Sequence, residues 1–287
     1  MSPDPFAVEI PRDAVRVQGP DAVSYLQGQV SQDVAALVDG ASAWSFVLQP
    51  QGKVDAWFRV TRRGSDAFVL DVDGGFGDAL VARLERFKLR TKAEIDLLDG
   101  WRCIAVRNSA SRHEWGSEGA LVTESGWVGV EGCDLLGPDV DAPEDVAAGT
   151  FEQYEALRIE CGVPAMGREL TERTIPAEAG VVDRSVSFTK GCYTGQELVA
   201  RIDSRGGNVP RRLRGLIVDG DGLPGAGAEV TIDEQVVGVV TSAAFSARLD
   251  AVVALAYVKR DVEPPTGGLV EGRVARIEAL PLLRSAE

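Results

Sequence analysis

The sequence predicts an α+β protein that ends in a small antiparallel β-barrel. Over the first part of the chain, short strands and helices alternate without an internal repeat. From Leu216 onward, short runs of Val and Ile are broken by Gly-rich or polar turns, which is typical of small barrels. The length of 287 residues, with 45% hydrophobic and 26% charged content, suits two or three compact units.

Two strands and one helix are predicted in the N-terminal half. Residues 43–48 and 54–60 are rich in β-formers and are separated by a turn at 50–53 that holds Pro and Gly, so we expect a hairpin. Residues 76–89 place their apolar side chains near helical spacing, with charges between them. This pattern predicts an amphipathic helix that packs on a sheet. Its apolar positions are Leu80, Leu84, Phe87 and Leu89.

A connection and a further helix follow. Residues 136–149 are rich in Gly, Pro, Asp and Glu, which suits an exposed connection between domains. Residues 151–160 have helical character, with Tyr154, Leu157 and Ile159 as apolar contacts. The strands expected in the barrel are 216–218, 229–232, 236–240 and 252–258, with 274–277 closing it.

The chain is acidic, with 30 basic and 44 acidic residues and a formal net charge of −14. This charge argues against general affinity for DNA, RNA or an anionic membrane. The N-terminus lacks the basic start and apolar core of a secretory signal, and no apolar run approaches the roughly 20 residues that a membrane helix needs. We therefore expect a cytoplasmic protein with no DNA and no membrane among its partners, and RNA is not expected either.

The cysteines argue against a resident metal. Cys103, Cys133, Cys161 and Cys192 are scattered without a CxxC pair, and His113 is the one imidazole of the sequence. A zinc site, a disulfide framework or a ferredoxin-like cluster site is therefore not predicted. If iron is handled, we expect contact that is transient or shared with a partner.

The octet at 190–197, Lys-Gly-Cys-Tyr-Thr-Gly-Gln-Glu, concentrates the reactive chemistry of the chain. Gly191 and Gly195 allow a sharp turn that presents the thiol of Cys192. Lys190 would favour the thiolate, which is the form that attacks electrophiles or binds metal. From the residues alone, a tight turn around a buried and inert cysteine stays an alternative.

The segment after the octet predicts a helix and an anion site. Residues 198–201 look helical, which places Cys192 just ahead of a helix start. Five arginines gather after the octet, in a region with one acidic residue among them, and guanidinium groups bind carboxylates or phosphates. A solvated linker is the alternative. The five are Arg201, Arg205, Arg211, Arg212 and Arg214.

The octet closely resembles the signature of the YgfZ-type folate-binding proteins, which are relatives of the glycine cleavage T-protein and support iron–sulfur enzymes. Further segments that resemble this family are 24–33, 48–53, 158–164 and 176–180. The resemblance implies a three-part T-protein-like fold around a tetrahydrofolate pocket. The expected parts are a discontinuous folate-binding domain formed by 1–45 and 145–208, an α+β domain at 46–144 and the barrel at 209–287.

The resemblance also implies site residues. Glu160 resembles the T-protein glutamate that binds the pterin. A carboxylate suits this role because it accepts two parallel N–H hydrogen bonds from an aminopyrimidine edge. A surface charge paired with Arg158 is the alternative for this residue. The other residues expected to bind the cofactor are Tyr193, Gln196, Glu197, Arg201 and Arg212, and the expected catalytic residues are Cys192, Lys190 and Asp55.

Two functions follow from the resemblance. The first is a folate-binding factor that supports assembly or repair of iron–sulfur clusters in client enzymes, with Cys192 as reactive thiol and the clients as transient partners. The alternative is a folate-dependent aminomethyl or C1 transferase or demethylase. Where the T-protein pattern has paired aspartates, this chain keeps Asp55 but has Ala56 beside it, and where the pattern has an asparagine, this chain has Asp71 and Asp73. General acid–base catalysis needs a carboxylate in reach of the transferred group, so the changed set puts aminomethyl transfer in doubt. A third possibility is a folate sensor with an incidental cysteine.

Overall fold

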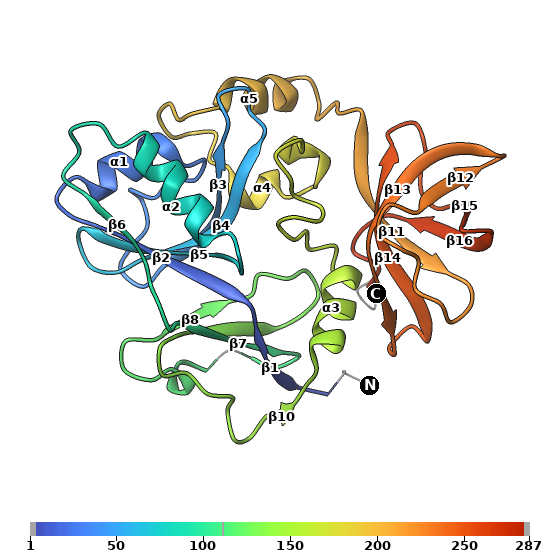
Figure 1. Cartoon of the computed structure of the whole chain (residues 1–287), viewed down its shortest axis with the longest axis horizontal. Coiled ribbons are helices and arrows are strands. Elements are labelled where there is room, and N and C mark those ends of the chain that lie inside the picture. The colour runs from blue at the N-terminus through green and yellow to red at the C-terminus, as the bar shows by residue number, and fades with distance from the viewer. Residues whose placement is uncertain (1–3, 111, 284–287) are drawn as a thin grey trace.

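Three sheets organise the protein, for which a computed structural model describes residues 4–110 and 112–283 (Figure 1). Residues 1–3 of the predicted non-secretory N-terminus lie outside this range. The sheets are two open five-stranded sheets and a closed barrel. No helix of the described residues is long and apolar enough to cross a membrane.

The first open sheet has the strand order β3-β4-β5-β2-β6 and carries two helices. Its strands are β2 (Arg12–Gln18), β3 (Ser42–Leu48), β4 (Val54–Arg62), β5 (Ala67–Asp73) and β6 (Glu94–Leu97). Its helices are α1 (Ala22–Gln29) and α2 (Gly77–Arg86). The predicted hairpin is confirmed, because β3 and β4 pair antiparallel with Phe46 opposite Trp57.

Helix α2 is shorter than predicted. The N–H of Phe87 already turns back to the carbonyls of Leu84 and Glu85, which closes the helix at this point. Arg90 then has a φ of 55°, a left-handed conformation that cannot continue a helix. Leu89 is consequently 83% exposed, so its predicted place on the apolar face is wrong.

The second open sheet has the strand order β10-β1-β7-β9-β8. Its strands are β1 (Phe6–Ile10), β7 (Arg102–Arg107), β8 (Leu121–Glu124), β9 (Gly132–Gly137) and β10 (Ala147–Ala148), and a short 3-10 helix, η1 (His113–Trp115), precedes β8. Only Pro11 separates β1 from β2, which belongs to the first sheet. Proline has no N–H to donate to a ladder, which suits the point where the chain leaves one sheet for the other.

The predicted C-terminal barrel is confirmed as a closed antiparallel barrel with the order β11-β14-β13-β12-β15-β16. The strands are β11 (Arg211–Val218), β12 (Glu229–Ile232), β13 (Gln235–Ser246), β14 (Ala251–Lys259), β15 (Thr266–Val270) and β16 (Arg273–Glu278). Strand β15 was not predicted; it contains two glycines and pairs with both β12 and β16. Glycine is unfavourable in strands, so the sequence pattern of this segment is weak, although the barrel needs the strand for closure.

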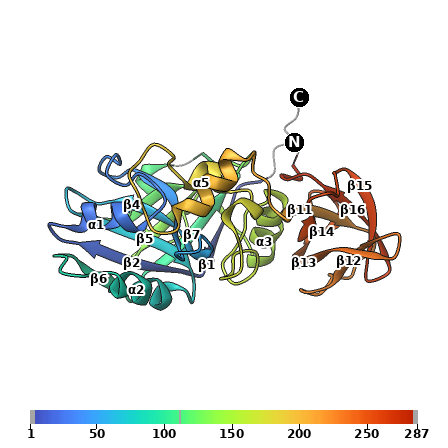
Figure 2. The same ribbon diagram turned by 90° about the horizontal axis from the view of Figure 1, so that it is seen from above.

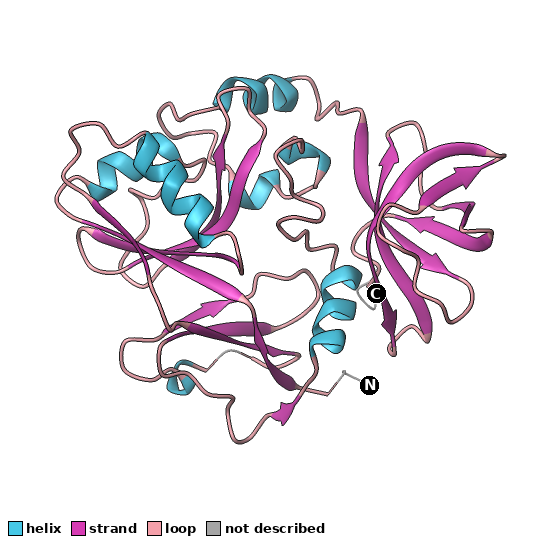
Figure 3. Ribbon diagram, in the orientation of Figure 1, coloured by secondary structure: helices cyan, strands magenta, loops and turns pink. Residues whose placement is uncertain are grey.

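Helix α3 (Phe151–Glu160) has the bounds that the sequence predicts, and it lies between the sheets and the barrel (Figures 1 and 2). A capping box between Thr150 and Gln153 fixes its start. It packs on β13 and β14 of the barrel and on β1 of the second sheet. The segment after α3 returns along the first sheet through η2 (Pro176–Glu178), α4 (Val182–Ser185) and α5 (Gln196–Ser204), and the first two residues of α5 are the last two of the octet. Figure 3 shows these short helices within long loops.

The expected domain boundaries stay a prediction. Strand β3 crosses the expected boundary at residue 45, and its hydrogen-bonded partner β4 lies on the far side. Strands β1 and β2 both lie in the expected first domain but belong to different sheets. The expected connection at 136–149 contains the end of β9 and the short strand β10.

Candidate functional site

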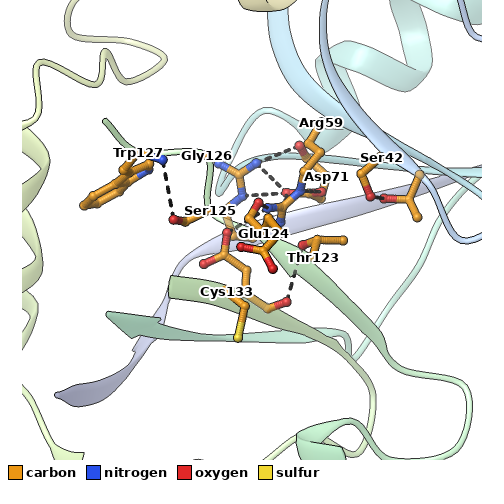
Figure 4. A network of polar contacts seen from close by, with 12 residues as sticks. Ser42, Arg59, Asp71, Thr123, Glu124, Ser125, Gly126, Trp127 and Cys133 are labelled. Carbon is orange, nitrogen blue, oxygen red and sulfur yellow. Dashed lines mark hydrogen bonds and ion pairs between the residues drawn. The ribbon is translucent and has the colours of Figure 1, made fainter. Parts of the chain in front are cut away.

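A buried network of charges joins the two open sheets. Arg59 on β4 donates to both oxygens of Asp71 on β5, at 3.0 and 3.2 Å, and to Asp134 on β9 at 2.9 Å. Arg12 also donates to Asp71, at 2.6 Å, and Arg107 donates to Asp134 at 2.8 Å. Figure 4 shows Arg59 and Asp71 close to the end of β8, where Arg59 also donates to the carbonyl of residue 124.

Two arginines set the pKa of Asp134 in this network. Burial by itself would raise the pKa of Asp134, but Arg107 and Arg59 beside it lower that pKa to about 2. Asp71 is fully buried and bound by two arginines. Its carboxylate therefore has a structural role between the sheets rather than a free oxygen for a ligand.

A small central pocket of about 150 Å³ adjoins the network. Aromatic rings form much of its wall, and Trp44 stacks on Trp57 with 4.1 Å between the ring centroids. Arg107 lies over the ring of Trp127 at 4.3 Å. Asp73 also lines it, binding Arg12 through one oxygen and accepting from the N–H of residue 166 through the other.

A larger cavity of about 930 Å³ lies between α3 and strand β13, and we call it the α3–barrel cavity. Three large apolar side chains that are exposed to solvent line it, namely Phe151, Leu223 and Phe245. Arg168 and Arg248 add positive charge. The cavity shares Phe151, Glu155 and Arg168 with the central pocket, so the two meet at these residues.

Glu160 lines the α3–barrel cavity and is 3% exposed. One carboxylate oxygen accepts a hydrogen bond from Ser246 on β13, and the other, Oε2, has no hydrogen-bond partner among the described residues. Burial raises the pKa of Glu160, while the Ser246 hydrogen bond and Arg248 act in the opposite direction. The alternative of a surface charge paired with Arg158 is wrong, because Arg158 binds Glu155 and Glu169 instead.

The octet forms an exposed loop that is fixed from below by its lysine. The ammonium of Lys190 donates to the carbonyls of Gln27, Val30 and Gln32 at 2.7, 2.6 and 3.0 Å. An ammonium has three N–H groups, so these carbonyls account for all of them. The expected effect of Lys190 on the thiol therefore stays a prediction. Cys192 is exposed, so the alternative of a buried cysteine is wrong.

Other residues of the octet shape the start of α5. The N–H of Tyr193 donates to the side-chain oxygen of Gln196 at 2.9 Å. This hydrogen bond closes the loop and uses the amide oxygen of Gln196. Gly195 has a φ of 83°, the left-handed region that glycine adopts at little cost. Glu197 and Arg201 point from α5 with exposed side chains. Ligand binding by these residues stays a prediction.

The remaining predicted residues lie in two further cavities. Arg212 donates to the carbonyl of Gly207 and lines a cavity of about 250 Å³ between η2 and α5. Asp55 accepts from Arg83 at 2.7 Å and lines a cavity beside α2. Glu160, the octet, Arg212 and Asp55 thus belong to four separate places, which argues against one catalytic constellation.

Strand β11 also divides the expected arginine cluster. Successive side chains of a strand point to opposite faces, so Arg211 is separated from Arg212 and Arg214. Arg211 binds Glu178 at 3.2 Å and lies over the ring of Tyr257. Arg201 and Arg205 are exposed at α5 and its end. The five arginines therefore do not converge on one anion.

Several residues of the two cavities were missed by the sequence analysis. Arg12 is the first residue of β2 and Arg107 is the last residue of β7, and charged residues at strand ends are usually exposed, so no local signal marked these two as buried. Phe245 and Arg248 had no signal either, because their place opposite α3 depends on tertiary packing. Among the described residues, no group of three or more His, Cys, Asp or Glu is arranged to hold a metal ion.

Comparisons with known proteins agree with this architecture. A family model described as the glycine cleavage T-protein C-terminal barrel domain matches residues 211–280. An uncharacterized protein of Haemophilus influenzae is 30% identical over 197 residues, which cover 68% of this chain and 67% of that protein. The tRNA-modifying protein YgfZ of Pectobacterium carotovorum is 28% identical over 236 residues, which cover 75% and 70%.

A solved structure confirms the expected three-part T-protein-like fold. The crystal structure of glycine cleavage system aminomethyltransferase T from Bartonella henselae matches with a TM-score of 0.83. The match covers 98% of this chain and 86% of that chain. The sequence identity is 21%, so this likeness concerns the fold alone.

Proposed function

Because the chain belongs to the YgfZ-type branch of the glycine cleavage T-protein superfamily, we propose that it binds tetrahydrofolate in the α3–barrel cavity. The observation that carries the proposal is Oε2 of Glu160, a buried acceptor without a partner among the described residues. A buried carboxylate oxygen that lacks a donor is costly, and a ligand N–H group removes that cost. The aminopyrimidine edge of a pterin offers such donors.

The walls of the cavity also suit a folate. Its volume of about 930 Å³ lies in the range of small-molecule sites. Phe151 and Phe245 offer aromatic surface to the flat rings of the ligand. Arg168 and Arg248 offer charge-assisted hydrogen bonds to the carboxylates of its glutamate tail.

Replacing Glu160 with Gln should weaken tetrahydrofolate binding by about 10- to 100-fold, because hydrogen bonds to a charged group are worth about 1.5–3 kcal/mol. Calorimetric titration of the wild type and the variant measures this. The control is Glu152→Gln, an exposed carboxylate that lines the same cavity and should bind with unchanged affinity. Equal affinity of Glu160→Gln and wild type would contradict the assignment.

The pH dependence of binding gives a second arm of the same experiment. Burial raises the pKa of Glu160, so the carboxylate takes up its proton at a higher pH than an exposed glutamate does. The protonated form accepts fewer hydrogen bonds, so affinity should fall as the pH falls through this raised pKa. The fall should be absent in Glu160→Gln. For folding the sign is opposite: the stability linked to Glu160 is present below its ordinary pKa of 4.5 and is lost as the pH rises.

We further propose that the folate-bound protein supports iron–sulfur clusters of client enzymes through Cys192. The thiol is exposed in a loop whose base is held by Lys190. A thiolate in this position supplies one ligand to an iron atom of the client. Stable binding of a whole cluster takes about four thiolates, so a single one does not remove the cluster from the client. Transient contact of this kind supports a repair or assembly role.

Cys192→Ser should abolish support of a client iron–sulfur enzyme while leaving tetrahydrofolate affinity within twofold of wild type, since the thiol lies outside the α3–barrel cavity. The measurement is the activity of an iron–sulfur dehydratase after oxidative stress, in cells that lack this chain and are complemented with each variant. Thr189→Ser, an exposed change in the same loop, is the matched control. Full support by Cys192→Ser would instead favour the folate sensor with an incidental cysteine.

The transferase alternative has less support. Asp71 is engaged by two arginines, and Asp55 binds Arg83 in a cavity that does not include Glu160. General acid–base catalysis needs a carboxylate within hydrogen-bonding reach of the transferred group. Neither aspartate lines the α3–barrel cavity.

A further inference from the structure

A separate cavity of about 590 Å³ lies between the β3–β4 turn and helix α2, and we call it the α2 cavity. Its volume is within the range of small-molecule sites. Amide side chains of the turn form one wall, and α2 forms the other. Among its lining residues are Gln49, Gln51, Asp55, Arg83, Arg86 and Phe87.

Arg83 is the buried charge of this cavity, with 10% of its side chain exposed. Its Nε donates to Asp55 at 2.7 Å, and its Nη2 donates to the carbonyl of Leu48 at 2.9 Å. Phe87 lies against the guanidinium, 4.0 Å from the carbon to the ring centroid. These contacts hold the guanidinium in one orientation.

The third nitrogen of this guanidinium, Nη1, is buried and has no hydrogen-bond partner among the described residues. Each Nη group carries two N–H donors, so two donors of a fixed cation are unused. Buried donors of charged groups without acceptors are costly and rare in folded proteins. An acceptor that reaches Nη1 therefore gains a charge-assisted hydrogen bond without a cost for orienting Arg83.

The charges of the cavity favour an anion as this acceptor. Asp55 balances Arg83, but Arg86 lines the same cavity and takes part in no ion pair among the described residues. The lining thus has an excess of positive charge in a protein whose formal net charge is −14. Positive charge inside a cavity of an acidic protein concentrates small anions there.

We propose that the α2 cavity binds a small anion through a carboxylate or phosphate group, held by Arg83 and Arg86. The planar donors of arginine match both kinds of oxyanion. Phe87 and the apolar side chains of α2 on the same wall accept a compact organic body attached to that group. This site is separate from the α3–barrel cavity and does not depend on folate binding.

The site adjoins the octet loop through close backbone packing. A Cβ added to Gly195 would lie 2.4 Å from the carbonyl oxygen of Gln49, and one added to Gly52 would lie 2.5 Å from Leu198. The turn that lines the α2 cavity is therefore in direct contact with the loop that carries Cys192.

Titration calorimetry of the full chain with sodium phosphate and with sodium citrate, at ionic strength held constant with chloride, tests the proposal. We expect saturable binding of at least one anion with a dissociation constant of about 1 mM or tighter. Binding of phosphate alone assigns the site to phosphate-bearing ligands. Binding of citrate alone assigns it to carboxylates.

Two exposed positions of α2 provide variants that keep the buried Arg83 contacts. Arg86→Gln removes one charge and Ala82→Glu adds an opposing carboxylate to the lining, and each should weaken binding by about tenfold. Lys88→Gln, which removes a charge outside the lining, should leave the affinity unchanged. The proposal would be overturned if the folded wild type bound neither anion. It would also be overturned if both lining variants bound the anion with an affinity within twofold of the wild-type value.

Discussion

Replacing Arg59 with Met should lower the free energy of unfolding by about 3–5 kcal/mol, because it removes one partner from a buried ion network. Arg59 connects Asp71 of the first sheet with Asp134 of the second. Without it, Asp71 keeps only Arg12 as an ion-pair partner and Asp134 keeps only Arg107, and both carboxylates stay buried. The change therefore weakens the junction between the two sheets rather than one strand.

Urea unfolding followed by circular dichroism measures this effect, with the midpoint and slope determined for each variant. The matched control is Arg16→Met on strand β2. Arg16 pairs with Asp96 at 2.9 Å, but both side chains are more than 40% exposed, so the loss should stay below about 1 kcal/mol. A loss of similar size in both variants would show that the buried network contributes little to stability.

Replacing Lys190 with Met should lower the free energy of unfolding by about 3 kcal/mol, because three carbonyls lose their shared charged donor together. These carbonyls belong to Gln27, Val30 and Gln32, which join the end of α1 to the following loop. Lys190→Arg should not restore the loss. The planar donors of a guanidinium do not reproduce the three directions of an ammonium. Lys92→Met, at an exposed position, is the control.

The pH dependence of this difference has a defined sign. Burial lowers the pKa of Lys190 from 10.5 to about 8. Between these values the unfolded chain binds more protons than the native protein, so the stability linked to Lys190 rises with pH. The difference in free energy of unfolding between wild type and Lys190→Met should therefore grow above pH 8. A difference that shrinks in this range would contradict the burial of a charged lysine.

Local patterns were sufficient for much of the fold. Short runs of Val and Ile between Gly-rich or polar turns predicted five barrel strands, and the start of α3 coincides with a capping box that depends only on Thr150 and Gln153. The missed strand β15 has two glycines, and its existence depends on partners in β12 and β16. Helix α2 ended early because Phe87 and Arg90 adopt turn conformations that hydrophobic spacing does not encode.

The site was less accessible to sequence reasoning because its geometry comes from distant segments. The burial of Glu160 depends on Ser246 in β13, and no local feature of α3 reveals that contact. Lys190 looked like an activator of its neighbour Cys192, but its hydrogen bonds go to residues near the start of the chain. Lys190 thus connects the segments 24–33 and 190–197, which lie far apart in the sequence.

The position of β1 has a consequence for the order of folding. Strand β1 is synthesised before both of its partners and lies inside the second sheet, between β10 and β7, with Ile10 opposite Cys103. Synthesis runs from the N-terminus at about 5–20 residues per second, so this strand must wait several seconds for its neighbour. During that time β1 is an unpaired apolar segment, open to wrong partners. The second sheet therefore forms only after β7 and β10 have been synthesised, although its interior strand β1 leaves the ribosome before both of them.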